Sequence, residues 1–433
     1  MATHICMFVN NPGLGDPRVT REAEVAVQAG CRVTVMAVQR PNEDGPLRQV
    51  QRGVTFFRPK VKPSKIVAWL RRFSKKKVPA RVEAQNDVRP SQDFAPARTS
   101  PRIFKRLCIC LWNWRHTLFY AIQAVPLALA TKADVYHAHD CDTLAIAWLC
   151  ARVRGRPLIY DSHELWVDHR IMGGASRLEV AKWRWMERVL VRQCRLCVTV
   201  SEGLRDLLYE RYRPRLMAVV KNCPRREAMA EIDRQDARTA CCIDRQAKLV
   251  VYQGGILRNR GLETLVMSAA RLRDVLFVLI GPLNEYATEL QRIVDAERIR
   301  NLRFLGHKDK SERDRFMGAA DIGVVLTQDR SLSYRHSLAN KVFEYLSNGL
   351  PVLLSTLPEY ERLASKIGAC IMSDPEDSDD VAEKLRAFFA MSQEARDAMG
   401  LRARKAFQEK YNMEKQMEPV LTFYAGCYTR NRD

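Results

Sequence analysis

"SLANKVFEYLSNGLPVLL" spans Ser337–Leu354 and decides the fold class. Its first part carries apolar residues at helical spacing, and the turn Asn348–Pro351 ends that helix because Gly and Pro interrupt helical backbone. The three residues from Val352 then form a short apolar run that is typical of a buried strand. A helix, a turn and a buried strand together make the repeating unit of a parallel sheet covered by helices. Glu344 is the exception, since it places a carboxylate inside an apolar stretch.

The same alternation runs through the whole chain, which at 433 residues is too long for one ordinary core and predicts two domains. Each half begins with a strand, a Gly-containing loop and a helix. Ligands of open α/β sheets bind at the carboxyl ends of the strands, so a cleft between the domains is the expected site. The main predicted strands are His4–Val9, Arg32–Val38, Asp134–His137, Pro157–Asp161 and Leu196–Val200 in the first half, and Leu249–Gln253, Val275–Ile280, Leu302–Leu305 and Ile322–Leu326 in the second.

The charge is strongly basic, with a net value of +21, and favours an anionic partner. Much of the excess is local: Arg58–Arg115 contains 16 Lys and Arg against three acidic residues. Within it, Lys75–Pro101 is polar and without periodicity, which predicts a mobile insertion. The adjoining stretch Ile103–Ala130 is aromatic and basic, and it has three interpretations: a pair of core helices, a nucleic-acid face or a membrane-surface element.

The thirteen cysteines have no regular spacing, and Met1–Val9 lacks the pattern of a signal peptide, so reduced cysteines in a cytosolic protein are the simplest interpretation. Cys194 and Cys197 stand alone as a C-x-x-C pair, which does not make a zinc site. No stretch reaches the length of a membrane-spanning helix, because charged residues interrupt even Ile103–Ala130.

The loop that follows the first strand of the second half, Gln253–Gly261, combines glycines with arginines. Gly254 and Gly255 let the backbone approach a ligand, and the forks of Arg258 and Arg260 suit phosphate oxygens. A diphosphate clamp is the functional interpretation, and a tight turn with solvated arginines is the structural one. The loop matches neither a P-loop nor a dinucleotide fingerprint.

Glu344 has two structural interpretations, a partly exposed helix residue or a capping carboxylate near a helix N-terminus. Its functional interpretation is a carboxylate that accepts hydrogen bonds from the two hydroxyls of a ribose. Asn340 and Lys341 lie just upstream and would present an amide and a cation to the same ligand.

In the first half, polar residues follow two strands: His137, His139 and Asp140 after one, and His163 after another. A bound metal is disfavoured because the spacing supplies no complete ligand set. The loop Asn10–Arg18 at the end of the first strand is placed to shape an acceptor pocket, or it is an ordinary strand-to-helix loop.

These stretches together resemble glycosyltransferase family 4, a retaining family with the GT-B fold, over nearly the whole chain. The resemblance rests on several motifs in the family's order: "DPRVTREAEVAVQAGCRVTVMA" (16–37), "DVYHAHD" (134–140), "PLIYDSHEL" (157–165), "VSEGLRDLL" (200–208), "YQGGILRNRGLETL" (252–265), "AADIGVVL" (319–326) and "NKVFEYLSNGLPVL" (340–353). It implies two Rossmann-like doubly wound domains facing a central cleft. The last motif is similar to an "NKxFEY" subgroup.

The resemblance also implies residue roles. Glu344 binds the ribose of a sugar nucleotide and Arg260 its diphosphate, while Gly255 stands where the family has an Arg, leaving Arg258 as a substitute. His336 stands where many relatives have the first Glu of E-x7-E. The resulting expectations are catalytic His163, His336 and Arg260; donor-binding Gly254, Gly255, Arg258, Arg260, Asn340, Lys341 and Glu344; and acceptor-binding Gly13, Gly15, Asp16, His139 and Asp140.

The expected domains are 1–222 for the acceptor, with a basic insertion over about 59–115, and 223–412 for the nucleotide sugar, with a tail, 413–433, that crosses back to the first domain. The expected reaction transfers a sugar from a UDP- or GDP-sugar to a lipid-linked or glycan acceptor with retention, in cell-surface polysaccharide synthesis. No metal or other cofactor and no nucleic acid is expected, and the protein would lie on the anionic inner face of the cytoplasmic membrane. The alternatives are a GT-B sugar-nucleotide epimerase and a non-catalytic membrane- or nucleic-acid-binding protein.

Overall fold

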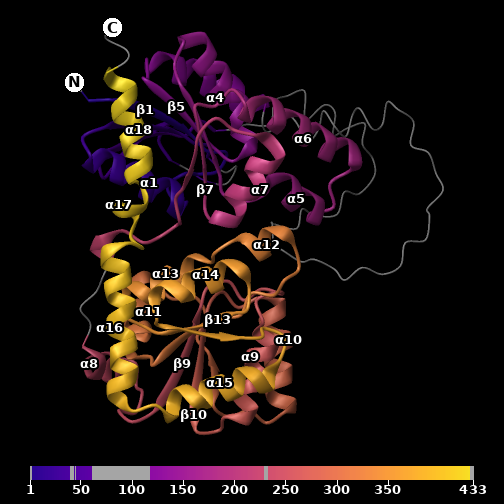
Figure 1. The fold of residues 1–433 in the computed structure, drawn as a ribbon, viewed down its shortest axis with the longest axis vertical. Helices are drawn as coiled ribbons and strands as arrows, with labels where there is room; N and C mark the ends of the chain where they lie inside the picture. The colour runs from indigo at the N-terminus through magenta and orange to yellow at the C-terminus, as the bar shows by residue number, and fades with distance from the viewer. Residues whose placement is uncertain (1, 40–42, 44, 61–117, 229–232, 430–433) are drawn as a thin grey trace, which may run out of the picture. The chain divides into compact units, whose positions relative to one another are not determined.

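The computed structural model describes residues 2–39, 43, 45–60, 118–228 and 233–429, which form two compact units (Figure 1). The first unit contains Met1–Thr199, Leu207–Ala218 and Met417–Asp433, and the second contains Val200–Asp206 and Val219–Gln416. The predicted basic insertion and the start of the predicted membrane-surface stretch fall on 61–117, outside the described residues. Of that surface stretch, residues 118–130 are described and are helical.

The first unit is built on an eight-stranded sheet with the order β3-β4-β2-β1-β5-β6-β7-β8. All of the strand pairs whose register is defined are parallel except β3 with β4, and His139 pairs with Asp161 across β5 and β6. The antiparallel β3–β4 hairpin lies in a stretch whose sequence pattern predicts no regular element. The strands are β1 (His4–Phe8), β2 (Arg32–Met36), β3 (Arg48–Gln51), β4 (Val54–Phe57), β5 (Val135–His139), β6 (Leu158–Ser162), β7 (Leu196–Thr199) and β8 (Met217–Val219).

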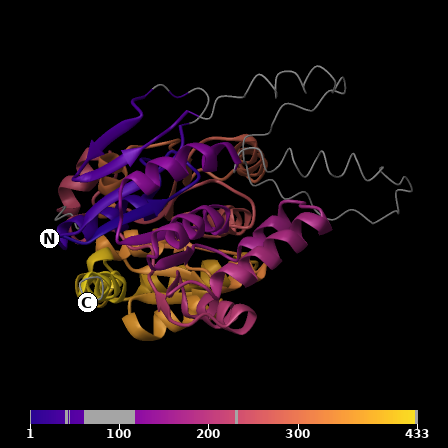
Figure 2. The ribbon, with the colours of Figure 1, turned by 90° about the horizontal axis from the view of Figure 1, so that it is seen from above.

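Helices follow these strands, as the alternation predicts. Asp16 caps α1 by accepting hydrogen bonds from two backbone N–H groups, and Pro17 occupies the first helical turn, where its missing N–H costs nothing. Both ribbon views show α18, from the end of the chain, beside β1 (Figures 1 and 2). The helices are α1 (Pro17–Gln28), α4 (Cys141–Arg154), α5 (Trp166–Met172), α6 (Arg177–Val191) and α18 (Glu418–Thr429), besides the helical residues 118–130. The helix α7 (Glu202–Tyr212) begins in the second unit and ends in the first.

The second unit has a six-stranded parallel sheet with the order β11-β10-β9-β12-β13-β14. Its strands β9, β10 and β12 are almost fully buried on both faces, which explains their unbroken apolar sequences. The strands are β9 (Lys248–Gln253), β10 (Val275–Ile280), β11 (Leu302–Phe304), β12 (Ile322–Val325), β13 (Val352–Ser355) and β14 (Cys370–Ser373).

The opening sequence stretch forms α13 (Asn340–Ser347), the turn and β13, as predicted. Its helix begins after Ala339 without a side-chain cap. Tyr345 lies against Gly323 of β12 so closely that a side chain there would clash. The other helices of this unit are α8 (Arg234–Ala240), α9 (Leu262–Arg271), α10 (Glu285–Ala296), α11 (Lys310–Ala319), α12 (Leu332–His336), α14 (Pro358–Ile367), α15 (Ser378–Ala390), α16 (Gln393–Glu409) and α17 (Met413–Gln416), with a short 3-10 helix, η1 (Arg226–Ala228).

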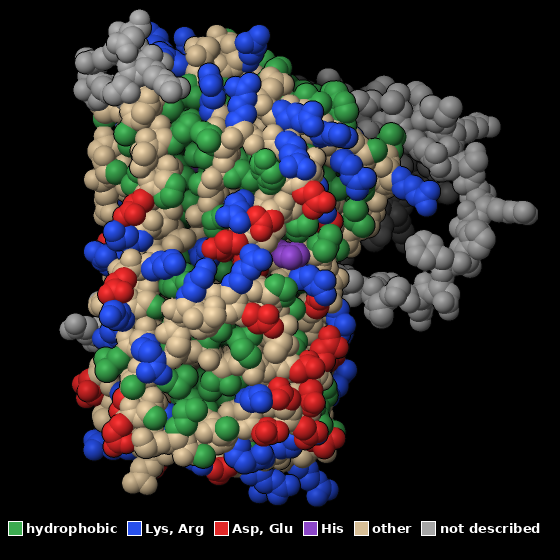
Figure 3. All heavy atoms as spheres, in the orientation of Figure 1, with side chains coloured by type: hydrophobic (Ala, Val, Ile, Leu, Met, Phe, Trp, Pro, Cys, Tyr) green, Lys and Arg blue, Asp and Glu red, His purple; other side chains and the backbone are tan. Residues whose placement is uncertain are grey.

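Two observations concern the predicted position at a membrane surface. Over the part of the chain that the structure describes, no helix combines the length and apolar character that crossing a membrane requires. The space-filling view shows Lys and Arg side chains, with few acidic ones among them, toward the upper end of the first unit (Figure 3). The basic character is therefore not confined to the insertion.

Candidate functional sites

The candidate site in the second unit includes the glycine loop that follows β9. Gly254 has a φ of +127°, and a Cβ atom there would lie 2.9 Å from the Lys341 Nζ atom. Gly261, which begins α9, has a φ of +62°, and its Cβ would lie 2.5 Å from the Leu326 carbonyl oxygen. Both positions need glycine for conformation and for space. The loop thus passes directly beneath a lysine side chain.

Two cations of the loop and of α13 lie near each other. The Lys341 ammonium sits 3.7 Å above the ring of Tyr252, and the Arg260 guanidinium lies 5.3 Å from the ring of Tyr334. Burial and the charge of Arg260 hold the pKa of Lys341 well below its ordinary value, and the charge of Glu344 offsets this only in part. Neither cation forms an ion pair with any residue that the structure describes. Positive charge is therefore concentrated at this point without an ion pair to any acidic residue in the described part of the chain.

The carboxylate of Glu344, which lies on the same helix as Lys341, is oriented by Gln253 at the end of β9. The carboxylate accepts a hydrogen bond from the Gln253 side-chain amide, and the Gln253 backbone N–H donates to the Tyr345 hydroxyl over 2.9 Å. Glu344 is half-buried in the middle of α13. An oriented carboxylate in a polar surrounding is suited to accept hydrogen bonds from ligand hydroxyl groups.

The remaining predicted donor residues are less well placed. Arg258 pairs with Glu289 of α10 and lies over the Tyr286 ring, so its charge is already balanced within the protein. A Cβ atom on Gly255 would lie 3.1 Å from the Leu257 side chain. Asn340 is exposed at the start of α13.

His336 lies at the end of α12 and contacts a different set of groups. A Cβ atom built on Gly203 would lie 2.4 Å from its Nδ1 atom and 2.6 Å from Glu359 Oε1, so the ring is packed against that glycine. The Glu359 carboxylate accepts a hydrogen bond from the Gly203 N–H over 2.9 Å. Burial and the charge of Arg335 lower the pKa of His336. Its predicted catalytic role stays a prediction.

The first unit holds a second candidate site at the ends of β5 and β6. Its centre is Arg18, whose Nε and Nη2 atoms donate to the two Asp161 oxygens over 2.8 Å each, while Nε lies 3.1 Å from Glu22. All three side chains are buried. Burial raises the pKa of Asp161, but the charges of Arg18 and His163 and the hydrogen bonds from the histidines together hold it well below its ordinary value. Burial raises the pKa of Glu22 to about 8.

Two histidines extend this network toward the surface. The His139 Nδ1 atom lies 3.2 Å from His163 Nε2, and His163 Nδ1 lies 3.2 Å from Asp140. Burial lowers the pKa of His139, while for His163 the carboxylates of Asp140 and Asp161 overcome burial and raise the pKa well above its ordinary value. His163 is 18% exposed, so it is the charged and accessible member of the network.

Backbone strain marks the same place. Asp140, a non-glycine residue, has a φ of +63° directly after β5, and its side chain accepts a hydrogen bond from the His163 N–H over 3.3 Å. Such a conformation costs roughly 1–3 kcal/mol and persists at functional sites. The structure thus brings His139 and Asp140, predicted to bind the acceptor, into contact with His163, predicted to be catalytic.

The three predicted acceptor residues in the glycine loop of the first unit have different surroundings. Gly13 has a φ of +73° and packs against Ala37, so its glycine is needed for the turn. Gly15 faces open space, because a Cβ atom there would meet nothing within 4 Å among the described residues. Asp16 accepts hydrogen bonds at the start of α1 and from Asn11, which accounts for both of its oxygens.

Sequence reasoning missed several members of the first site. Arg18 and Asp161 lie inside the motifs 16–37 and 157–165, and the available signal was an arginine in the first turn of the helix that follows a strand. Tyr424 of α18 carried no signal, yet its hydroxyl lies 2.8 Å from His137 Nδ1, and the His137 ring stacks on His139 at 4.4 Å. A contact over 287 positions cannot be read from local patterns.

Four buried residues of this site, Glu22, His137, His139 and Asp161, have ligand atoms within 4.8 Å of one another, close enough to hold a metal ion. Their carboxylates already bind a cation, the Arg18 guanidinium. The donor set is therefore balanced by the protein itself, and the expectation that no metal is needed stays a prediction.

Comparisons with known proteins agree with this architecture. Residues 77–223 match the family model described as Glycosyltransferase Family 4, and residues 258–422 match the model described as Glycosyl transferase-like. No curated protein matches the chain.

Solved structures match over almost the full length. The chain is similar to sucrose-phosphate synthase from Thermosynechococcus elongatus, with a TM-score of 0.72, 15% identity and coverage of 99% of this chain and 100% of that one. It is also similar to HepE from Anabaena in complex with UDP and glucose (TM-score 0.67, 13% identity, 97% and 99% covered). An α,α-trehalose-phosphate synthase (UDP-forming) from Burkholderia vietnamiensis matches with a TM-score of 0.66 and 14% identity over 100% of both chains. The fold is GT-B, and both halves of the chain carry glycosyltransferase-type domains.

Proposed function

We propose that this protein transfers a sugar from a nucleoside-diphosphate sugar to an acceptor hydroxyl, with retention of the anomeric configuration. The observation that carries the proposal is the pair of cations in the second unit. Lys341 and Arg260 lie beside a glycine loop without an ion-pair partner among the described residues, and the pKa of Lys341 is lowered by burial and by Arg260. A dianionic ligand at this point would neutralise both charges.

Glu344 defines the rest of the donor. A carboxylate fixed by Gln253 on the helix that carries Lys341 would accept hydrogen bonds from both hydroxyls of a ribose. Cations for a diphosphate and a carboxylate for a ribose together describe a nucleotide rather than a plain phosphate. Because three similar structures are of HepE with UDP or UDP-glucose, or UDP with glucose, UDP is the first nucleotide to test, with GDP beside it.

The chemical step follows from this charge arrangement. The bond between the sugar anomeric carbon and the diphosphate oxygen breaks, and the negative charge that develops on the leaving diphosphate is stabilised by Lys341 and Arg260. The acceptor oxygen forms the new bond on the same face, and its proton passes to the leaving diphosphate. Electrostatic stabilisation of the leaving group is the main contribution of the protein.

The first unit is proposed to bind the acceptor. Its accessible imidazolium, His163, is a hydrogen-bond donor at neutral pH and is assigned to the reaction, while Asp140 and His139 hold its ring in position. A lipid-linked or glycan acceptor, and a role in cell-surface polysaccharide synthesis at the inner face of the cytoplasmic membrane, are proposed from the resemblance and from the basic stretch of sequence.

Thermal unfolding with nucleotides tests the proposal directly. A ligand at a hundred times its Kd adds about 2.7 kcal/mol to the free energy of unfolding, which raises the Tm measurably. We expect UDP or GDP to raise the Tm of the wild type, and Glu344→Ala to lose most of that shift. Glu361→Ala is the matched control, because Glu361 is exposed on α14, outside the site. Equal shifts in all three proteins, or none in the wild type, would overturn the nucleotide assignment.

A further inference from the structure

A cavity in the first unit lies away from the histidine network. It has a volume of about 580 Å³, within the range of sites that hold small organic molecules. Pro157 and Leu158 at the start of β6 line it, as do Arg195, which precedes β7, and Gly155, which ends α4. The histidine network lies at the opposite, carboxyl ends of the strands. The cavity is therefore a separate place in the same unit.

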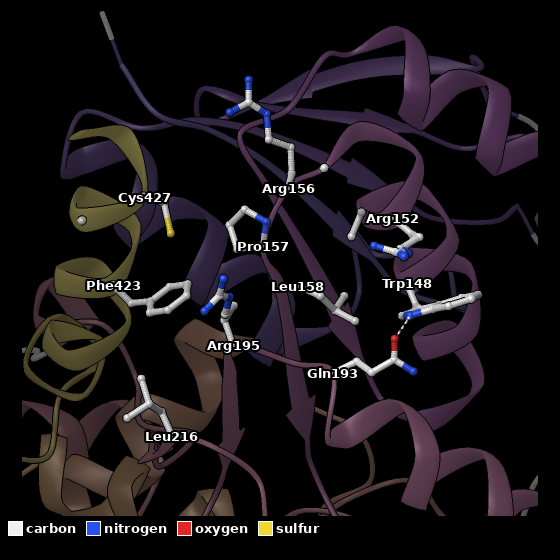
Figure 4. Close-up of a pocket in the computed structure, with 13 residues that line it drawn as sticks. Trp148, Arg152, Arg156, Pro157, Leu158, Gln193, Arg195, Leu216, Phe423 and Cys427 are labelled. Atoms are coloured by element: carbon white, nitrogen blue, oxygen red, sulfur yellow. Dashed lines mark hydrogen bonds between the residues drawn. The ribbon is translucent and has the colours of Figure 1, made fainter. Parts of the chain in front are cut away.

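The lining combines arginines with aromatic rings, and none of the described residues that form it is acidic. Arg152, Arg156 and Arg195 supply three positive charges, and Trp148 and Phe423 supply flat apolar surfaces (Figure 4). The Trp148 indole N–H donates to Gln193 over 2.7 Å, which fixes one wall. Guanidinium groups bind phosphate oxygens through paired hydrogen bonds, and aromatic surfaces pack against an organic body.

The three arginine side chains have no polar partner among the described residues. Their side chains form no ion pair and no hydrogen bond with any described residue, although Arg154 in the same segment donates to the Leu129 carbonyl. Like charges gathered without a counter-ion repel one another, so an anionic ligand would remove an unfavourable interaction. Figure 4 shows the Arg195 side chain directed into the space between Phe423 and Pro157.

One wall of the cavity belongs to α18, which also reaches the histidine network. Phe423, Gly426 and Cys427 line the cavity, and Tyr424, the residue after Phe423, contacts His137 Nδ1. His137 stacks on His139, which contacts His163. A ligand that bridges α18 and the arginines would therefore stabilise the helix that supports the buried histidines.

We propose that this cavity is a second ligand site, which binds a small phosphorylated compound through Arg152 and Arg195 and fixes α18 against the sheet. The site is independent of the nucleotide site in the second unit. The shared chemistry is a phosphate group on an organic body, which either a soluble sugar phosphate or a lipid headgroup carries. A cavity of about 580 Å³ suits the soluble compound.

Alkylation of Cys427 reports on the cavity in the full-length protein. The Cys427 side chain is partly accessible and lines the cavity, while Cys242 is exposed in the second unit and serves as an internal reference. Site-resolved mass spectrometry after iodoacetamide treatment gives both rates. Glucose 6-phosphate at ten times its Kd should slow Cys427 alkylation about tenfold and leave Cys242 unchanged, and neutral glucose should do neither.

Variants separate this site from the nucleotide site. Arg195→Glu and Arg195→Gln should each abolish the protection, and the Gln variant guards against a folding defect from charge reversal. Arg188→Glu, at an exposed position on α6 outside the cavity, and Lys341→Ala should keep it. Protection by vesicles containing phosphatidylglycerol, but not by phosphatidylcholine vesicles or glucose 6-phosphate, would keep the phosphate site and assign it to a lipid headgroup. No protection by any phosphate probe, or protection lost in Lys341→Ala, would overturn the proposal.

Discussion

The two candidate sites differ in how their charges are balanced. In the first unit, Arg18 neutralises Asp161 and lies against Glu22, and the histidines complete a closed network. In the second unit, Lys341 and Arg260 lie near each other without a paired counter-ion among the described residues. The first arrangement balances its charges within the protein, whereas we propose that the second is stabilised when an anion binds.

This difference predicts which residues contribute to folding stability and which contribute to ligand affinity. A buried ion pair depends on both partners, and removing one leaves an uncompensated charge. An unbalanced pair of cations has the reverse property, because removing one relieves repulsion and weakens only ligand binding. Unfolding measurements with and without nucleotide therefore distinguish the two kinds of site.

Arg18→Ala should have the largest effect. It leaves the carboxylates of Asp161 and Glu22 buried without their cation, and we expect the free energy of unfolding to fall by about 3–5 kcal/mol. Denaturant unfolding followed by circular dichroism measures the loss. The exposed Arg188→Ala should change stability by less than about 0.5 kcal/mol. A value for Arg18→Ala as small as that of the control would contradict the network.

Lys341→Ala should show the opposite signature. Stability without ligand should stay the same or rise slightly, because burial and Arg260 both oppose the ammonium charge. Nucleotide affinity should fall roughly 10- to 100-fold, the effect of one hydrogen-bonded charge. Titration calorimetry with the nucleotide that stabilises the wild type measures this loss. A variant that binds as tightly as the wild type would place the diphosphate elsewhere.

The sequence predicted the fold well because the fold depends on local periodicity. Buried runs such as β9 and β10 carry only apolar residues inside the strand, and the glycines at Gly254 and Gly261 stand where backbone conformation demands them. The β3–β4 hairpin was missed for two reasons. β3 is the edge strand and has no buried residue, so it carries no apolar alternation. β4 lies inside the sheet and alternates buried with half-buried residues, but over only four positions.

The candidate sites were predictable only in part. Lys341 and Glu344 lie in one helix, so their relation follows from spacing alone. The Arg18–Asp161 pair and the Tyr424–His137 contact join residues 143 and 287 positions apart, and no short-range pattern records them. Arg258 lies in a loop and its partner Glu289 in α10, 31 positions away, so the sequence could not show that the charge of Arg258 is balanced.

The smallest effect is a pH dependence that separates His163 from the rest of its network. The carboxylates of Asp140 and Asp161 raise the pKa of His163 in the folded protein despite its burial, so the folded state binds this proton more tightly than the unfolded chain does. Its contribution to stability is complete below the unfolded value of about 6.5 and is lost as the pH rises toward the folded pKa.

Glu22, with a pKa raised by burial to about 8, changes stability in the same direction over part of this range. The comparison of wild type with His163→Gln cancels that shared part: we expect the stability difference to be largest near pH 5.5 and to shrink steadily toward pH 9. Unfolding midpoints at several pH values measure it, and a difference that is constant with pH would mean that His163 is not the charged member of the site.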